Sequence, residues 1–234
     1  VTAVGKPVVL VISAGSALDL SWADAHVAAI IDSFYPGARG GKAVAEVIFG
    51  DFSPSGKLPV TFYQGTENLP EFTDYDMSDR TYRYTDKNVL YPFGYGLHYG
   101  TIRYENAQIS CAQCGVRDAV DVSVDVINES SYTIHESVQA YIQHEEADAY
   151  EPGYQLKGIQ TVTLQPKETK RVTISLKARD FAIITQEGEC VVRPGSYRIA
   201  IGGQQPDARS AKLTGSDVAA LVVRREGEQT PVEY

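Results

Sequence analysis

The sequence predicts an α/β unit followed by an all-β unit, because its hydrophobic pattern changes near residue 100. Before that point, a continuous apolar run over residues 8–12 precedes a helical stripe over residues 42–49. Such an order is typical of strands and helices that alternate around a parallel sheet. After that point, apolar and polar residues alternate over short segments separated by turns, which is typical of a β-sandwich. We therefore expect one domain at residues 1–100 and a second at residues 101–216.

The elements of the first unit follow from local patterns. Every residue of the run 8–12 is apolar, so we expect a strand that is buried on both faces. Residues 27–34 place apolar side chains at helical spacing, and the pattern alone leaves a helix and a strand open. The helix over residues 42–49 is followed by Gly50, which suits a C-cap, and a strand resumes at Val60. This order predicts right-handed crossovers onto a parallel sheet.

The remaining segments divide into a long loop, the sandwich strands and a tail. Residues 63–100 hold many Tyr, Asp and Pro residues and little periodicity, so we expect a long loop that is functional or wraps the domain. Residues 217–234 are expected to be a C-terminal tail with a short apolar piece and a loose end. The alternating segments that predict sandwich strands are residues 120–126, 138–142, 172–176 and 197–201.

Two ordered motifs carry a resemblance to a known family. Residues 35–62 contain Y-P-G, a glycine pair, F-G-D and S-P-S-G-K-L-P-V-T-F. Residues 79–97 contain R-T-Y-R-Y and Y-P-F-G-Y-G-L. Both runs resemble the second domain of glycoside hydrolase family three, which holds β-glucosidases, β-xylosidases and relatives. His98 stands where that family usually has Ser.

The second half resembles the fibronectin-type-III-like domain that closes many chains of this family. Lys167 stands where the family more often has Gly, a difference that a turn absorbs. The resemblance implies that the first unit is the later part of an α/β sandwich domain and that a β-sandwich follows it. It also favours a strand over residues 27–34, with a short helix near Trp22. The segments that match the fibronectin-type-III-like domain are residues 156–159, 164–169 and 193–197.

The resemblance also implies a chemistry. The family hydrolyses glycosides with retention, through the usual pair of carboxylates. Its nucleophile is an Asp of a separate barrel domain, and its acid/base is commonly a Glu of the second domain that precedes the strand matching residues 8–13. Both positions fall before Val1, so we expect no catalytic residue in this chain. Its expected role is to complete the aglycone side of the pocket and to brace an N-terminal barrel, in the same gene product or as a companion chain.

Arg80, Tyr82 and Arg83 are the expected substrate-binding residues. An aromatic face stacks on a sugar ring, and an Arg guanidinium donates to hydroxyls of an oligosaccharide or glycoside. The alternative is structural, because the two arginines can pin the loop by pairing with nearby carboxylates. The run from Arg80 to Tyr84 favours a β-xylosidase over a β-glucosidase. The carboxylates within reach of such pairing are Asp74, Asp76 and Asp79.

A carbohydrate-binding or structural module without catalysis is the alternative function. Such a module requires an exposed aromatic platform on the sandwich, which Tyr132, Tyr141, Tyr150 and Tyr154 can supply. Tyr141 also fits a strand position that faces the core. An enzyme part that lacks its barrel predicts something different, namely an exposed face that is unusually apolar for a monomer.

Composition argues against several other classes. The net charge of −9 argues against nucleic acid and anionic membranes as partners, and no apolar run approaches the ~20 residues of a membrane helix. Cys111 and Cys114 have CxxC spacing, but no second pair completes a zinc site and no thioredoxin-like context surrounds them. The acidic residues near His144 are interpreted as a solvated loop tip, so we expect neither metal nor cofactor.

The start of the sequence contains no recognisable targeting signal. It begins with Val and an apolar strand, without an initiator Met or a basic n-region. We therefore expect an excised or processed product, and the localisation stays unknown.

Overall fold

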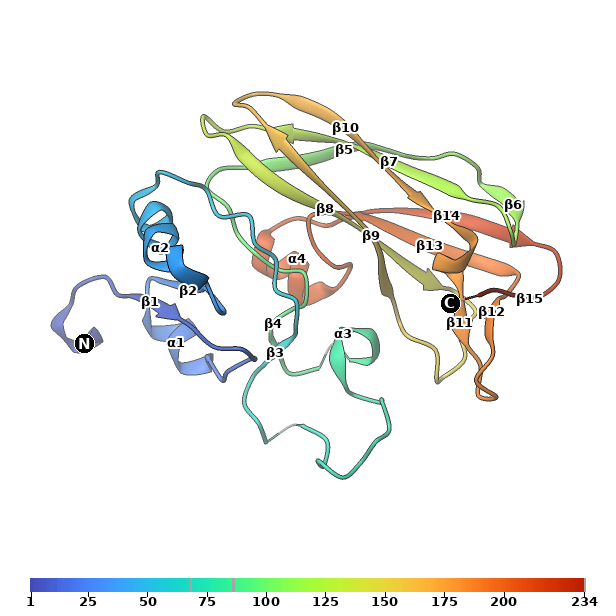
Figure 1. Ribbon diagram of the computed structural model, residues 1–234, viewed down its shortest axis with the longest axis horizontal. Helices are drawn as coiled ribbons and strands as arrows, with labels where there is room; N and C mark the ends of the chain where they lie inside the picture. Colours follow the sequence, from blue (N-terminus) through green and yellow to red (C-terminus); the bar gives the residue numbers. More distant parts are fainter. Residues whose placement is uncertain (68, 86, 234) are drawn as a thin grey trace.

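The computed structural model describes residues 1–67, 69–85 and 87–233 and has an α/β part and a β-sandwich. Figure 1 shows the N-terminal elements gathered at one end and the long sandwich strands at the other. No helix in the described ranges is both long and apolar enough to cross a bilayer. The predicted combination of an α/β unit with an all-β unit is confirmed.

The α/β part is built around a parallel strand pair. After the 3-10 turn η1 (Thr2–Val4), strand β1 (Val9–Ile12) pairs in parallel with β2 (Ala29–Asp32). Helix α1 (Ser21–His26) connects them, so the strand assignment within residues 27–34 is confirmed. The turn η2 (Gly37–Arg39) leads into helix α2 (Gly40–Phe49), which ends at Gly50 with φ of 80° as predicted for a C-cap.

Two predictions for this part are wrong. Strand β1 is not buried on both faces, because Val9 and Val11 are 42% and 41% exposed while the alternate residues face a small core. The strand expected from Val60 does not join the parallel sheet. It forms β3 (Phe62–Tyr63), which pairs antiparallel with β4 (Val89–Tyr91). Backbone bonds between Leu58 and the segment that follows β4 direct the chain to this partner.

The sandwich consists of a three-stranded and a five-stranded sheet. The first has the order β10 (Thr169–Leu176), β7 (Val120–Asn128) and β5 (Ile102–Ile109), with antiparallel neighbours. The second has the order β6 (Gln113–Gly115), β14 (Ala219–Glu226), β13 (Gly195–Gly202), β8 (Ile134–His144) and β9 (Gln155–Leu164). The smaller elements are β11 (Ile183–Ile184), β12 (Cys190–Val192), β15 (Thr230–Pro231), η3 (Ala178–Phe181), α3 (Thr81–Tyr84) and α4 (Ala208–Thr214).

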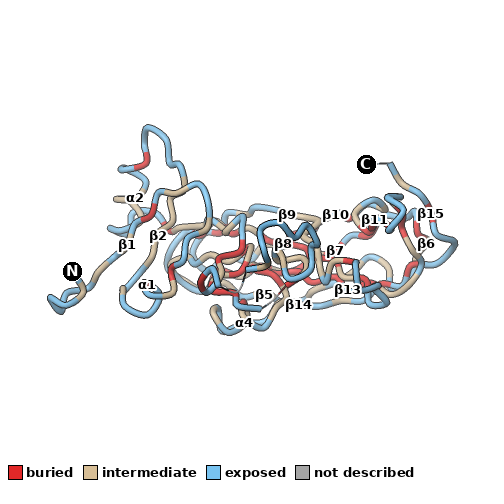
Figure 2. The backbone as a smooth tube through the Cα atoms, turned by 90° about the horizontal axis from the view of Figure 1, so that it is seen from below, coloured by how far each residue is buried: buried red, intermediate tan, exposed pale blue. Residues whose placement is uncertain are grey.

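The core lies between these two sheets, where Figure 2 shows the buried backbone concentrated. The alternation predicted for residues 120–126 is confirmed, since the four valines of β7 are fully buried and the residues between them are not. The same holds for β10. Strand β8 is also buried at Gln139 and Tyr141, because its outer face is covered by the α/β part.

The C-terminal segment differs from the loose tail that the sequence predicts. Strand β14 lies inside the five-stranded sheet, between β13 and β6. Its Val223 is fully buried, and so is Arg225 with 1% exposure. The pair Arg224-Arg225 hid the strand in the sequence, because a buried arginine breaks the apolar alternation. Tyr234 lies outside the described residues.

The two parts join through glycines of the family-like motifs. Gly94 has a φ of 75°, and a Cβ there would lie 2.4 Å from Gln139 Oε1 and 2.6 Å from Tyr141 Oη. Gln139 Nε2 donates to the Gly94 carbonyl at 3.0 Å. At Gly96, a Cβ would lie 2.0 Å from the backbone oxygen of Gly56. Backbone-to-backbone contact of this kind requires glycine.

Candidate substrate-side loop and its surroundings

Arg80 orders the loop that precedes α3. Its Nη2 donates to the carbonyl oxygens of Glu71 at 2.9 Å and Asp74 at 2.6 Å, and its Nε donates to that of Asp76 at 3.0 Å. Asp76 Oδ1 accepts from the Ser78 amide at 2.7 Å, and hydrogen bonds from Ser78 lower the pKa of Asp76. Arg80 therefore holds the loop through carbonyl oxygens and not through the carboxylates named in the structural alternative.

Tyr82 and Arg83 attach α3 to the sandwich. The Tyr82 ring stacks on Phe93 with centroids 4.0 Å apart and an 8° interplanar angle, and its hydroxyl accepts from the Leu156 amide at 3.1 Å. Arg83 Nη2 donates to Gln155 Oε1 at 2.5 Å. Both partners lie at the start of β9. Tyr82 and Arg83 thus lie at the junction of the two parts, whereas Arg80 contacts the loop alone.

The exposed aromatic residues of this loop were missed by sequence reasoning. Phe72 is 93% exposed and Tyr75 is 89% exposed, whereas one face of the Tyr82 ring is covered by Phe93. The sequence did contain a sign of their exposure, because both aromatic residues lie in an acidic segment that has no apolar periodicity. Exposed aromatic rings on an ordered loop are suited to contact a ligand or a neighbouring domain.

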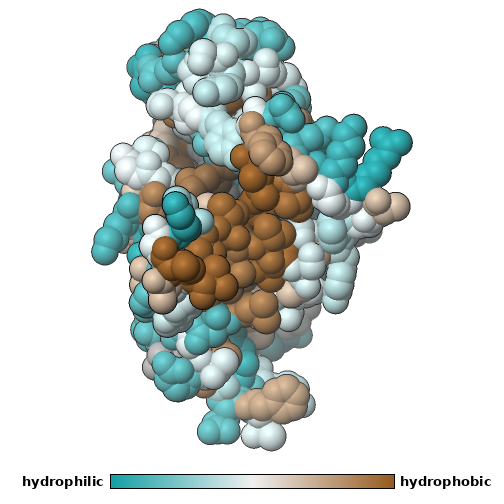
Figure 3. Space-filling model, turned by 90° about the vertical axis from the view of Figure 1, so that its left-hand side faces the viewer, coloured by the Kyte–Doolittle hydropathy of each residue, from teal (hydrophilic) through white to brown (hydrophobic). Residues whose placement is uncertain are grey.

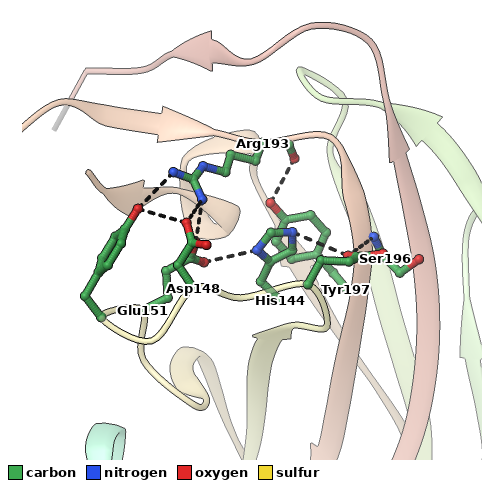
Figure 4. Close-up of polar contacts among 8 residues, drawn as sticks. His144, Asp148, Glu151, Arg193, Ser196 and Tyr197 are labelled. Carbon is green, nitrogen blue, oxygen red and sulfur yellow. Dashed lines mark hydrogen bonds and ion pairs between the residues drawn. The ribbon is translucent and has the colours of Figure 1, made fainter. Parts of the chain in front are cut away.

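The acidic residues near His144 form an ion-pair network around Arg193 (Figure 4). Glu151, whose side chain is 1% exposed, contacts His144 Nδ1 at 3.0 Å and Arg193 Nη1 at 2.7 Å. Arg193 Nη1 also contacts Asp148 Oδ2 at 2.7 Å and holds the pKa of Asp148 below its ordinary value. Burial raises the pKa of Tyr197, which stacks on His144, to about 12. Glu151 is therefore not a solvated tip, because its buried carboxylate pairs with Arg193 and lies within hydrogen-bond distance of His144 Nδ1.

A second buried cluster ties the two parts together beside a cavity of about 230 Å³. Glu136 of β8 is 2% exposed and lies 3.1 Å from Lys57 Nζ and 3.6 Å from His98 Nε2. Burial lowers the pKa of His98 and raises that of Tyr104 well above its ordinary value. A Cβ on Gly203 would lie 2.5 Å from Tyr104 Oη. This cluster is an ionic joint between the domains.

Carboxylates also line a larger cavity of about 540 Å³ beside β13 and α4. Glu145 pairs with Arg198 at 3.1 Å, and Asp207 caps α4 by accepting from the amides of Arg209 and Ser210. Both carboxylates therefore have structural roles. In the part of the chain that the structure describes, no group of three or more His, Cys, Asp or Glu side chains is arranged to hold a metal ion.

The four tyrosines of the alternative function do not make one platform. Tyr141 is 1% exposed, which confirms the core-facing position. Tyr154 packs edge-on against Tyr141 at 6.0 Å between centroids. Tyr132 and Tyr150 are 52% and 37% exposed but flank opposite ends of β8. Such a strand is roughly 35 Å long, so a short oligosaccharide cannot contact both rings at once.

Comparison with known proteins assigns the chain to a family. Residues 1–99 match the glycosyl hydrolase family 3 C-terminal domain, and residues 136–205 match the fibronectin type III-like domain. The sequence is 35% identical to a β-xylosidase of Formosa agariphila over 90% of this chain and 30% of that protein. It is 36% identical to a xylan 1,4-β-xylosidase of Xylanibacter ruminicola over 91% of this chain and 24% of that protein.

A solved structure agrees with these matches. A β-glucosidase from Erythrobacter marinus superimposes with a TM-score of 0.81 and 33% identity, over 96% of this chain and 29% of that one. The chain thus spans about a quarter to a third of the proteins it matches. It belongs to glycosyl hydrolase family 3, of which it carries the C-terminal domain followed by the fibronectin type III-like domain.

Proposed function

We propose that this chain is the C-terminal, non-catalytic portion of a retaining β-glycosidase that hydrolyses terminal β-D-xylosides or β-D-glucosides. It braces an N-terminal barrel and shapes the aglycone side of the pocket, while both catalytic carboxylates lie in parts of the enzyme outside residues 1–234. The share of the relatives' length that the chain spans supports this proposal, and so does the family to which it belongs. The observation that carries it is an apolar face at the α/β end.

The apolar face consists of Val9 and Val11 of β1 and of Ile48 and Phe49 of α2. These residues are between 41% and 81% exposed. Figure 3 shows hydrophobic surface gathered at the end that carries β1 and α2. Surfaces of this kind mark an interface in soluble proteins. A barrel of the same enzyme is the occupant that the relatives' greater length supports.

The substrate-side loop supports the second half of the proposal. We propose that Arg80, Tyr82 and Arg83 act on substrate binding as positioning residues, since their contacts hold the loop that presents Phe72 and Tyr75. Exposed aromatic rings stack on sugars, and nearby carboxylates accept hydroxyl hydrogen bonds. The xyloside preference expected from the Arg80–Tyr84 run fits three β-xylosidases among the relatives. Three other relatives are β-glucosidases, so the proposal keeps both sugars.

A pair of matched variants tests the bracing role in the complete enzyme. Val11→Asp places a charge on the apolar face, whereas Val222→Asp places the same charge on an exposed valine of β14 in the sandwich. We expect Val11→Asp to lower the thermal midpoint of the complete enzyme and its activity, because the buried charge lacks a partner. Val222→Asp should leave both near wild type. Equal behaviour of the two variants contradicts the proposed interface.

The loop is tested separately by steady-state kinetics of the complete enzyme. Arg80→Ala removes three bonds to loop carbonyls, so the loop loses its fixed shape. We expect KM for a xylo-oligosaccharide to rise about tenfold, corresponding to about 1.4 kcal/mol of binding, with a smaller change for a nitrophenyl glycoside that is short on the aglycone side. Asp79→Asn is the control, since the exposed pair with Lys87 contributes little and Asn tolerates the φ of 57° at this position. An unchanged KM for both substrates contradicts the positioning role.

A further inference from the structure

The cysteine pair of the sandwich lies side by side in the fold. Cys111 precedes β6 and Cys114 lies within it, and both side chains pack against the main hydrophobic core. Only two residues separate them, both contact the same core cluster, and burial together with the nearby Cys111 side chain raises the pKa of Cys114. Strand β6 is the edge of the five-stranded sheet and pairs in parallel with β14, where Cys114 is opposite Arg225. The CxxC spacing thus brings two thiols together at one sheet edge.

A buried arginine fixes the position of one thiol. Arg225 is 1% exposed, and its Nη1 lies 3.3 Å from Cys114 Sγ. Its Nη2 donates to the carbonyl oxygens of Val116 at 2.9 Å and Asp118 at 2.8 Å, and the guanidinium lies 4.3 Å from the centroid of the Phe181 ring. Arg225 therefore holds Cys114 and the residues that follow it, so Cys114 has little freedom to move away from its neighbour.

We propose that Cys111 and Cys114 form a reversible disulfide, a thiol-oxidation site that closes the turn at the edge strand β6. Such a bond is distinct from the catalytic redox role that the sequence argues against, because it needs only two adjacent thiols and an external oxidant. Cys190 lies on β12 and takes no part. The site is independent of the glycosidase assignment.

The reaction balances with a disulfide oxidant such as oxidised glutathione. The Cys111 thiolate attacks one glutathione sulfur and releases one glutathione thiolate, which leaves a mixed disulfide. The Cys114 thiolate then attacks Cys111 Sγ, forms the protein disulfide and releases the second glutathione thiolate. The two protein thiol protons pass to the released thiolates, and the oxidant gains two electrons. Burial raises the pKa of Cys114, so Cys114 reacts second, within the mixed disulfide.

Oxidation of the folded chain with oxidised glutathione tests the site by mass spectrometry. Trypsin cleaves after Arg103 and Arg117, so both thiols lie in one peptide and Cys190 lies in another. We expect the mass of peptide 104–117 to fall by about 2 Da on oxidation, and the number of titratable thiols to fall from the three of the sequence to one. Dithiothreitol should reverse both changes. A bond that includes Cys190, or mixed glutathione disulfides alone, overturns the proposal.

A flexible CxxC peptide also oxidises, so a second measurement isolates the contribution of the fold. The glutathione equilibrium constant is compared between the native chain and the chain unfolded in urea. We expect the native constant to be larger by about tenfold, with a rise of the thermal midpoint by on the order of 2–4 °C on oxidation. Cys190→Ser should keep both effects, and Cys111→Ser should abolish them. A native constant equal to or below the unfolded one overturns the proposal.

Discussion

At the scale of single residues, the backbone conformation at Lys167 explains a departure from the family pattern. Lys167 has a φ of 65°, the left-handed region that favours glycine. Residues with a Cβ are destabilised there by about 1–2 kcal/mol. The turn between β9 and β10 absorbs this cost, as expected from the sequence.

The conformation predicts that Lys167→Gly stabilises the chain. We expect the free energy of unfolding to rise by about 0.5–1 kcal/mol, because relief of strain exceeds the greater entropy of glycine in the unfolded state. Urea denaturation measures this change. Lys167→Ala is the control, since it removes the same side-chain contacts and keeps the Cβ. Stabilisation by Ala equal to that by Gly refutes the backbone explanation.

Gly94 is the opposite case, where glycine is already in place. Gly94→Ala combines a positive φ with a Cβ 2.4 Å from Gln139 Oε1. We expect a loss of about 2–3 kcal/mol in the free energy of unfolding. Gly41→Ala is the matched control, because Gly41 lies in α2 with nothing near its Cβ position. That change should stabilise the chain slightly. A Gly94→Ala variant as stable as wild type contradicts the described junction.

At the scale of elements, the joint between the domains predicts a pH dependence. The pKa of His98 is below its ordinary value. Burial is the main cause and the charge of Lys57 adds to it, while the Glu136 carboxylate acts in the opposite direction. The unfolded chain therefore binds a proton on His98 at a higher pH than the folded chain. The stability that depends on neutral His98 is fully present well above the ordinary His pKa of about 6.5 and is lost as the pH falls below it.

This sign gives a testable difference between His98 and the residue usual in the family. Between about pH 8 and pH 5, the free energy of unfolding should fall more steeply for the wild type than for His98→Ser. Urea denaturation at a series of pH values measures both slopes, and the difference between them removes the contribution of all other groups. Identical slopes for wild type and His98→Ser contradict the burial of a neutral His98.

Local patterns predicted the elements whose signal is contained in adjacent residues. The alternating valines of β7 predicted a strand correctly, because one face of that strand is buried and the other is not. Helix α2 was recognisable from its apolar stripe and Gly50. Pairings between distant residues left no such signal. Arg193 pairs with Glu151, which lies 42 residues earlier in the sequence. Strand β3 pairs antiparallel with β4, because Leu58 forms backbone hydrogen bonds with Gly94 and Tyr95.

The candidate site, too, was predictable only where its signal lies in adjacent residues. The resemblance indicated that Arg80, Tyr82 and Arg83 are important, but it did not show that Arg80 binds three loop carbonyls. The residues left exposed on the loop, Phe72 and Tyr75, could not be distinguished from core residues without the fold. Exposure depends on which segments cover a side chain, and composition does not contain that information.

At the scale of the whole molecule, the apolar face and the ionic joint together suit the chain to dock as a single unit. The joint of Lys57, Glu136 and His98 holds the sandwich to the α/β part, while the apolar face at the far end of the α/β part remains open. The chain is thus suited to dock as one unit against another domain. The proposed partner is the barrel that carries the catalytic nucleophile.

Hydrolysis of nitrophenyl-β-xyloside and nitrophenyl-β-glucoside tests this claim most directly. The chain of residues 1–234 is assayed alone and after addition of the barrel portion, with the barrel portion alone as the control. We predict no turnover by the chain, and turnover by the combined portions that exceeds that of the barrel alone. Robust hydrolysis by the isolated chain contradicts the account, because both carboxylates would then lie within residues 1–234.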